Sequence, residues 1–258
     1  MNGFAIQAEG LCFSYDQGEV LHGLTFQLRA GEVLGLLGAN GAGKSTTLKI
    51  LAGILTSGSG KIRVQDFTLP EDRDQAKHIL GYVPENAALY ESLSAKEFLE
   101  LCGRLHEIEE KKLQRKISQL LEVFELSKER FRRLVTFSKG MRQKVLIAAA
   151  LIHDPQILLL DEPLSGLDVM SSMLVKDLLA ALARDGRAVF YSSHVLDVVE
   201  RVCDRVLIIH KGSLIADGTP EELKATGGRE TLEDAFRSLT QASSTGPLVG
   251  GILEAMKL

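Results

Sequence analysis

A glycine-rich loop between a strand-like segment and a helix-like segment constrains this chain more than any other feature. Residues 38–46 read Gly-Ala-Asn-Gly-Ala-Gly-Lys-Ser-Thr and fit the pattern G-x-x-x-x-G-K-[ST]. The apolar run 33–37 before the loop is typical of a buried strand, and apolar residues at 48, 51, 54 and 55 follow with helical spacing. The sequence therefore predicts a strand, a tight loop and a helix in immediate succession.

Such a loop suits a nucleotide phosphate better than the alternative, an ordinary glycine-rich turn. Glycines let backbone N–H groups curl around phosphate oxygens without Cβ clashes, and the start of the following helix adds a partial positive charge. Lys44 is expected to reach the β- and γ-phosphates, and the Ser45 hydroxyl is expected to coordinate Mg²⁺. The predicted nucleotide-binding residues of the loop are Gly38, Asn40, Gly41, Ala42, Gly43, Lys44, Ser45 and Thr46.

Alternating strand and helix patterns predict an α/β fold for the rest of the chain. Strand patterns cover 61–64, 79–83, 157–160, 188–191 and 205–209, and helix patterns cover 171–183 and 194–202. This alternation predicts a mostly parallel sheet flanked by helices on both faces. Short apolar runs separated by turns over 4–37 predict an N-terminal antiparallel β-subdomain.

A helical block interrupts the alternation. Ser94 and Glu97 form a capping-box pattern at the start of one helix, and Leu113, Ile117 and Leu121 share one face of a second. We therefore expect an inserted helical subdomain over about 86–153.

The composition narrows the class of protein. The 258 residues are 45% hydrophobic and carry a formal net charge of −4, so an ample core is expected and nucleic acid is not an expected partner. The three cysteines lie far apart, which predicts neither a zinc site nor a disulfide framework and favours the cytoplasm. No apolar run approaches the roughly 18 residues of a membrane-spanning helix, and no signal-peptide pattern is evident. Any membrane role is expected to depend on another chain.

Two acidic residues and a histidine follow predicted strands. Asp161 and Glu162 directly follow one apolar strand pattern, and His194 follows another. Because ligands of open α/β sheets bind at the carboxyl edge, Asp161 is placed to hold Mg²⁺ and Glu162 to polarise an attacking water. His194 is expected to contact a phosphate or to position Glu162, the alternative being a structural histidine. Ser138 and Gly140 begin a further helix, where they could cap it or bind an anion.

In their order and spacing, these motifs resemble those of the nucleotide-binding subunits of ATP-binding cassette (ABC) transporters over about residues 4–226. The resemblance implies a P-loop NTPase core that takes ATP with Mg²⁺. The glycine-rich loop matches the family's Walker A motif, and Asp161 and Glu162 match the Walker B aspartate and the catalytic glutamate. It implies catalytic roles for Glu162, His194 and Lys44.

Three further segments carry the resemblance. Tyr15 matches the aromatic residue that stacks on adenine. Ser138 and Gly140 match the signature motif, which contacts the γ-phosphate, and Asp168 ends a D-loop that begins at Ser165. The resemblance therefore implies that all four expected site residues bind the nucleotide, although they lie far apart in the sequence.

Three features depart from the common family pattern, and one of them, Val169 in place of the proline common after the D-loop aspartate, carries no inference. The signature usually reads L-S-G-G-Q, whereas residues 137–141 read Phe-Ser-Lys-Gly-Met. This version, with Lys139 and Met141, resembles the subgroup that works with ABC-2-type export permeases. Glu85 occupies the position of a glutamine that usually contacts Mg²⁺, and a carboxylate can also be a ligand of that ion.

The resemblance implies an ATPase subunit that energises a separate integral membrane permease, an exporter of ABC-2 type. Two copies are expected to close head to tail as a homodimer, so that Ser138 of one copy meets the γ-phosphate held by Lys44 of the other. The surface around Glu85 and the helical subdomain would contact the permease. The expected location is cytoplasmic, peripheral on the inner face of the cell membrane.

Two other functions compete with this one. The first is an ABC ATPase without a transporter, acting on ribosomes, DNA or chromosomes; such members usually carry two cassettes with a basic linker, zinc-binding cysteines or a long coiled coil, and none of these is evident in the sequence. The second is a small-molecule kinase or a GTPase, which would leave the signature and D-loop motifs unexplained. An N-K-x-D guanine motif is also not found.

The resemblance also suggests the domain boundaries. An ABC ATPase domain is expected over 1–228 and a C-terminal extension over 229–258, in which 231–236 resembles a short element of the export subgroup. The segment from about 241 contains Ser-Ser-Thr-Gly-Pro and Gly-Gly. It is expected to be a flexible tail, with docking onto a partner or a second copy as the alternative.

Overall fold

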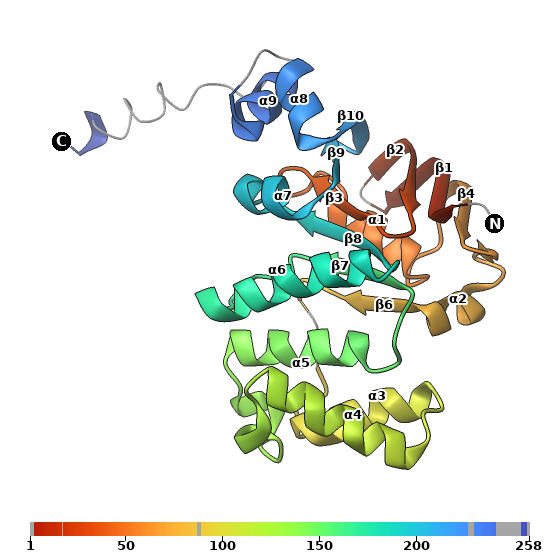
Figure 1. Cartoon of the computed structure of the whole chain (residues 1–258). Coiled ribbons are helices and arrows are strands. Elements are labelled where there is room, and N and C mark those ends of the chain that lie inside the picture. The colour runs from red at the N-terminus through yellow and green to blue at the C-terminus, as the bar shows by residue number, and fades with distance from the viewer. Residues whose placement is uncertain (1–2, 17, 87–88, 227–229, 241–253, 257–258) are drawn as a thin grey trace.

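Figure 1 shows the protein as a computed structural model, which describes residues 3–16, 18–86, 89–226, 230–240 and 254–256. The strands are β1 Phe4–Tyr15, β2 Gly18–Arg29, β3 Val33–Leu37, β4 Ser59–Val64, β5 Phe67–Leu69, β6 Leu80–Val83, β7 Ile157–Asp161, β8 Ala188–Ser193, β9 Arg205–His210 and β10 Ser213–Gly218. The helices are α1 Lys44–Leu51, α2 Arg73–Ile79, α3 Ala95–Leu105, α4 Glu110–Val123, α5 Lys139–Leu151, α6 Val169–Arg184, α7 Leu196–Val202, α8 Pro220–Thr226 and α9 Leu232–Leu239. Within these ranges, no helix has both the length and the hydropathy needed to cross a membrane.

Six strands form the central sheet, in the order β10-β9-β3-β8-β7-β6. The five strands from β9 to β6 run parallel, and β10 pairs antiparallel with β9. Parallel strands covered on both faces are expected to be apolar throughout. Accordingly, β3 and β7 are buried at every position. The predicted mostly parallel sheet is confirmed.

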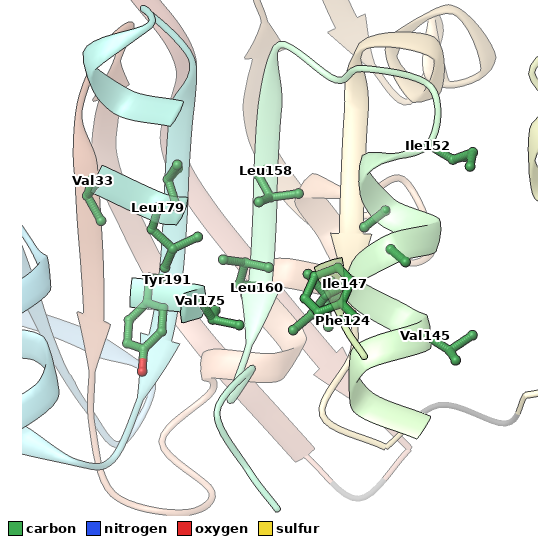
Figure 2. Packing of buried hydrophobic residues seen from close by; sticks show 14 of the residues in the cluster. Val33, Phe124, Val145, Ile147, Ile152, Leu158, Leu160, Val175, Leu179 and Tyr191 are labelled. Carbon is green, nitrogen blue, oxygen red and sulfur yellow. The ribbon is translucent and has the colours of Figure 1, made fainter. Parts of the chain in front are cut away.

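The side chains of the central sheet alternate between two hydrophobic cores. In β7, Leu158 and Leu160 enter the core formed with α5, α6 and α7, and Figure 2 shows Leu160 beside Val175 of α6. Ile157 and Leu159 enter the other core, which α1 and the antiparallel sheet complete. Figure 1 shows these layers on the two sides of the central sheet. One face is therefore covered by helices, whereas the other is shared between helices and a second sheet.

The antiparallel sheet has the strand order β2-β1-β4-β5 and confirms the predicted N-terminal β-subdomain. Its β2 strand packs on the central sheet, where Phe26 stacks on Phe190 with ring centroids 5.4 Å apart. The next strand in the chain, β3, belongs to the central sheet, where it pairs with β8 on one side and β9 on the other. The strand before the glycine-rich loop is thus fixed from both sides.

Helices α3, α4 and α5 lie together at one end of the central sheet (Figure 1). The predicted capping box opens α3: the Ser94 side chain accepts from Glu97 N, and the Glu97 carboxylate accepts from Ser94 N at 2.8 Å. Leu113, Ile117 and Leu121 are the buried side of α4, as their spacing predicts. These helices form the segment that the sequence marks as an insertion.

Four elements were not anticipated from the sequence: β5, α2, β10 and α8. Strand β5 has three residues, and α2 buries only Ala76, so neither leaves a periodic apolar pattern. Helix α9 covers the 231–236 element; Leu232 and Ala235 are buried there, and α9 packs against α7 and α8. The expected flexible tail from about 241 lies outside the described residues, apart from 254–256.

Candidate functional site

The glycine-rich loop joins the C-terminal end of β3 to the first turn of α1. Gly43, the residue before α1, has a φ of 109°, which side chains disfavour. A Cβ atom on Gly43 would also lie 2.5 Å from Leu21 Cδ2 of β2. The Thr47 hydroxyl donates to Gly43 O over 2.9 Å. The loop is therefore held over the start of α1, where the helix leaves N–H groups for an anion.

Lys44 is folded back onto this loop. Its side chain is buried, and Nζ donates to Gly38 O at 2.7 Å and to Ala39 O at 3.2 Å. Burial lowers the pKa of Lys44. Three carboxylates oppose that pKa shift: Glu162, Asp161 and Glu85. The ammonium thus lies within electrostatic reach of an acidic cluster.

A cleft of about 380 Å³ opens beside the loop. Its lining residues are Tyr15, Val20, Asn40, Gly41, Gly43, Lys44, Ser45, Thr46, Glu85 and Glu162. Tyr15 is 45% exposed, and its ring meets the ring of Phe13 edge to face, with centroids 4.8 Å apart. A partly exposed aromatic ring suits the stacking of a flat base. The cleft therefore brings together an aromatic platform, a phosphate loop and carboxylates.

The last residue of β7, Asp161, and the residue after it, Glu162, are held by residues at the end of β8. Asp161 pairs in register with Ser192, and Ser192 Oγ donates to Asp161 Oδ1 at 2.5 Å. Both side chains are buried. Ser192 was not predicted as a site residue, because its role depends on the register of two strands that are distant in sequence.

Glu162 has a left-handed backbone conformation, with a φ of 49°. Non-glycine residues in this region are strained and cluster at functional sites. Its Oε1 accepts from His194 Nδ1 at 2.6 Å, and its Oε2 accepts from Ser193 Oγ at 3.3 Å. Because an ionised carboxylate can only accept, Nδ1 of His194 carries a proton. The pair predicted from the sequence is thus in direct contact, although His194 itself does not line the cleft.

Oxygen ligands suited to Mg²⁺ surround the loop. Ser45 offers a hydroxyl, and Glu85 and Asp161 offer carboxylates, which are the ligand types that this ion takes. No group of three or more His, Cys, Asp or Glu in the described ranges is arranged to hold a metal ion. The donor set therefore fits an ion that is also held by nucleotide phosphates, as Mg²⁺ usually is.

Ser138, Gly140 and Asp168 are not among the residues that line the cleft. Ser138 caps α5 and accepts from Met141 N at 3.2 Å. Asp168 caps α6, and its hydrogen bonds with Ser171 lower its pKa to about 2. The capping role expected for Ser138 is confirmed. One chain thus brings the loop and the catalytic pair together but leaves the signature residues outside.

Comparisons with known proteins give consistent results. The family model described as ABC transporter matches residues 21–165. The chain is 36% identical over 227 residues to the linearmycin resistance ATP-binding protein LnrL of Bacillus subtilis (strain 168), covering 88% of this chain and 73% of that protein. It is 38% identical over 216 residues to the ABC transporter ATP-binding protein NatA of the same organism, covering 83% and 88%. A solved structure of an ATP-binding subunit of an ABC transporter superposes with a TM-score of 0.86 at 32% identity, covering 92% of this chain and 99% of that one.

Proposed function

The chain belongs to the ABC transporter family as an ATP-binding subunit that hydrolyses ATP, and we propose that it couples this reaction to export through a separate membrane permease. The observation that carries the proposal is a site that is half built. The cleft holds Lys44 and Glu162, whereas Ser138 caps a helix outside it. A second copy is the natural source of the missing half.

Two copies arranged head to tail would complete each site. The N-terminus of α5, with Ser138 and Gly140, would approach the γ-phosphate held in the partner's cleft, and a helix N-terminus suits an anion. Val169 and Met170, directly after Asp168, are 75% and 73% exposed. A second copy would cover these apolar side chains, which supports a homodimer as the working form.

Glu162 is the residue proposed to polarise the attacking water. Its carboxylate is held on one side by His194 and on the other by Ser193, and its remaining lone pairs can accept a hydrogen bond from water. With Nδ1–H directed at Glu162, Nε2 of His194 is the ring atom left for a phosphate oxygen. It donates to that oxygen only when the ring is protonated.

The loop residues would stabilise charge as the phosphoryl group transfers. Lys44 would exchange its bonds to Gly38 O and Ala39 O for β- and γ-phosphate oxygens. Ser45, Asp161 and Glu85 would hold Mg²⁺, which would supply positive charge to offset the charge that develops during the transfer. Tyr15 would stack on the adenine. These residues therefore bind and orient ATP, and Glu162 and His194 act on the water.

We place the chain on the inner face of the cell membrane, bound to an ABC-2-type exporter. The name of LnrL ties that relative to resistance to linearmycin, a role that suits export. Lys139 and Met141 match the signature version that resembles the export subgroup. The surface around Glu85 and helices α3–α5 is the proposed permease contact. The permease would select the transported substrate.

We also propose that the chain divides into an ATPase domain over 1–228, with a helical part over about 86–153, and an extension over 229–258. The contacts of α9 with α7 and α8 support an extension that begins as a packed helix. In this division the ATPase domain contains every residue assigned to the site.

Glu162→Gln is the variant that tests this function. It keeps the side-chain shape but removes the charge that polarises water, so hydrolysis should fall by about a hundredfold or more while ATP binding persists. The ATP-bound dimer should then accumulate, as measured by size-exclusion chromatography with light scattering in Mg·ATP.

Glu125→Gln is the matched control, because Glu125 also has a left-handed backbone, with a φ of 59°, and is exposed outside the cleft. It should keep wild-type hydrolysis. Near-normal turnover by the Glu162 variant, or a monomer under all nucleotide conditions, would contradict the proposal.

A further inference from the structure

Lys139, the signature residue that replaces the usual family glycine, is hydrogen-bonded to the D-loop of its own chain. Its Nζ donates to Ser165 Oγ at 2.7 Å. Lys139 is also the first residue of α5, where the partial positive charge of the helix N-terminus disfavours a lysine. A lysine at position 139 is therefore electrostatically unfavourable for α5. Its bond to the D-loop offers a reason for a lysine at this position.

The contact between the two segments extends to their backbones. A Cβ atom on Gly140 would lie 2.5 Å from Gly166 O, so this approach requires a glycine at 140. On the other side, a Cβ atom on Gly166 would lie 2.9 Å from Cγ and Cδ of Lys139, and Gly166 has a φ of 79°. The start of α5 and the D-loop are therefore packed as one unit.

The D-loop in turn is bonded to the catalytic glutamate. Ser165 N donates to Glu162 O at 3.0 Å. At the other end of the D-loop, Lys144 Nζ of α5 lies 3.8 Å from Asp168 Oδ2, which forms a second link between the segments. A short path of contacts thus runs from Lys139 through Ser165 to Glu162.

We propose that Lys139 is a positioning residue that, through Ser165, couples the signature segment of a chain to the Glu162 of the same chain. The inference rests on the proposed head-to-tail dimer. In that dimer Ser138 and Gly140 meet the partner's nucleotide, whereas Glu162 acts on the nucleotide of its own cleft. Lys139 therefore links one ATP site to the other, and its loss should reduce the cooperativity between them.

A different role is possible for a lysine beside a phosphate-binding serine: direct contact with the partner's γ-phosphate. The two roles differ in their dependence on Ser165. A positioning role acts through the Ser165 hydroxyl, so removal of either partner has the same effect. A direct phosphate contact does not involve Ser165 at all.

The test is a double-mutant cycle on ATP hydrolysis with Lys139→Met, Ser165→Ala and the double variant. Met keeps most of the stem that lies on Gly166 but loses the ammonium. Each single variant should lower kcat about three- to tenfold with KM changed by less than about twofold, and should reduce the Hill coefficient for ATP. The double variant should be no slower than the slower single variant, and Lys139→Arg should restore much of kcat.

Lys128→Met is the matched control, since Lys128 is an exposed lysine outside the cleft and both motifs. The midpoint of thermal unfolding should stay within a few degrees of wild type for each variant. Additive effects of the two substitutions, or a loss of kcat in Lys139→Met with a wild-type Ser165→Ala, would overturn the positioning role. Wild-type hydrolysis independent of protein concentration would instead count against the dimer, and so against both proposals.

Discussion

Asp161 illustrates, at the scale of single residues, how the site depends on neighbours that no motif contains. Its carboxylate is buried at the end of β7 and is bonded to Ser192 of the adjacent strand. A buried charge needs such a partner, because its solvation by water is lost. The hydroxyl of Ser192 is therefore expected to matter for stability as well as for the orientation of Asp161.

Ser192→Ala should lower the free energy of unfolding by about 1–3 kcal/mol, since a buried carboxylate loses a donor. Urea unfolding monitored by circular dichroism at neutral pH measures this loss. Ser172→Ala, a half-buried serine on α6, gives the effect of removing a hydroxyl away from the site and should be close to neutral. A Ser192 variant as stable as wild type would show that Asp161 is stabilised without this bond.

Most of the cleft residues that were predicted from the sequence lie in contiguous motifs, whereas Tyr15 and Glu85 were predicted as single positions from the family resemblance. Lys44 and Ser45 follow from the loop pattern, and Glu162 follows from its place after an apolar strand. The Lys139–Ser165 bond was not predictable in the same way. It joins residues 26 positions apart, and only the packing of α5 on the D-loop brings them together.

At the scale of elements, three histidines mark the joint between the helical segment and the sheet. His106 at the end of α3 stacks on His153 after α5, with ring centroids 3.7 Å apart, and His78 of α2 meets His106 edge to face. His153 Nε2 donates to Leu80 O of β6 at 3.0 Å. Burial, followed by the neighbouring His106, lowers the pKa of His153 from 6.5 to about 4.

This shift predicts a pH-dependent stability. Between about pH 6.5 and 4 the unfolded chain binds the proton more readily than the folded chain, so the free energy of unfolding falls as the pH falls through this window. Above pH 6.5 the contribution is constant. Lys116, which lies near His153, acts in the same direction because its charge also disfavours protonation.

His153→Gln removes the titrating group but keeps an amide that can donate to Leu80 O. Its free energy of unfolding should therefore change less than that of wild type between pH 7.5 and pH 5, as measured by urea titrations at both values. His210→Gln, outside the histidine stack, gives the effect of losing a histidine elsewhere. Equal pH dependence in wild type and the His153 variant would contradict this account.

The elements that sequence patterns located are those with one long apolar stripe or a fully apolar strand. The capping box of α3, the stripe of α4 and the strands β3 and β7 all belong to this group. Strand β10 was not predicted from the sequence because it lies at an edge of the sheet, where most positions are only half-buried and apolar and polar residues do not alternate. The local sequence pattern thus predicts buried helices and strands, whereas an edge strand is defined by its pairing with a strand elsewhere in the chain.

At the scale of the whole molecule, the half-built site implies that one copy of the chain can bind ATP, whereas hydrolysis needs a second copy. Ser138 has a capping role inside its own chain, and we assign it a phosphate contact in the partner's cleft. Asp at this position should cap α5 as well as Ser does, because the helix N-terminus favours a negative side chain. It would, however, repel the γ-phosphate of the second copy.

Ser138→Asp should therefore leave stability within about 0.5 kcal/mol of wild type, and ATP binding by the monomer unchanged. ATP-driven dimerisation and hydrolysis should be lost. Equilibrium binding of a fluorescent ATP analogue, light scattering and a phosphate-release assay measure the three properties. Hydrolysis at the wild-type rate by this variant would remove Ser138 from the site, and weakened monomer binding would place it in its own cleft.

The position of β3 has a consequence for the synthesis of the chain. Both neighbours of this strand, β8 and β9, come from residues 188–193 and 205–210, although β3 itself ends at residue 37. While the ribosome makes the first 187 residues, the strand that carries the phosphate loop has neither of its partners. The nucleotide cleft can therefore be completed only after β8 and β9 have been made, and a nascent chain that stops before them has no finished site in which to hold ATP.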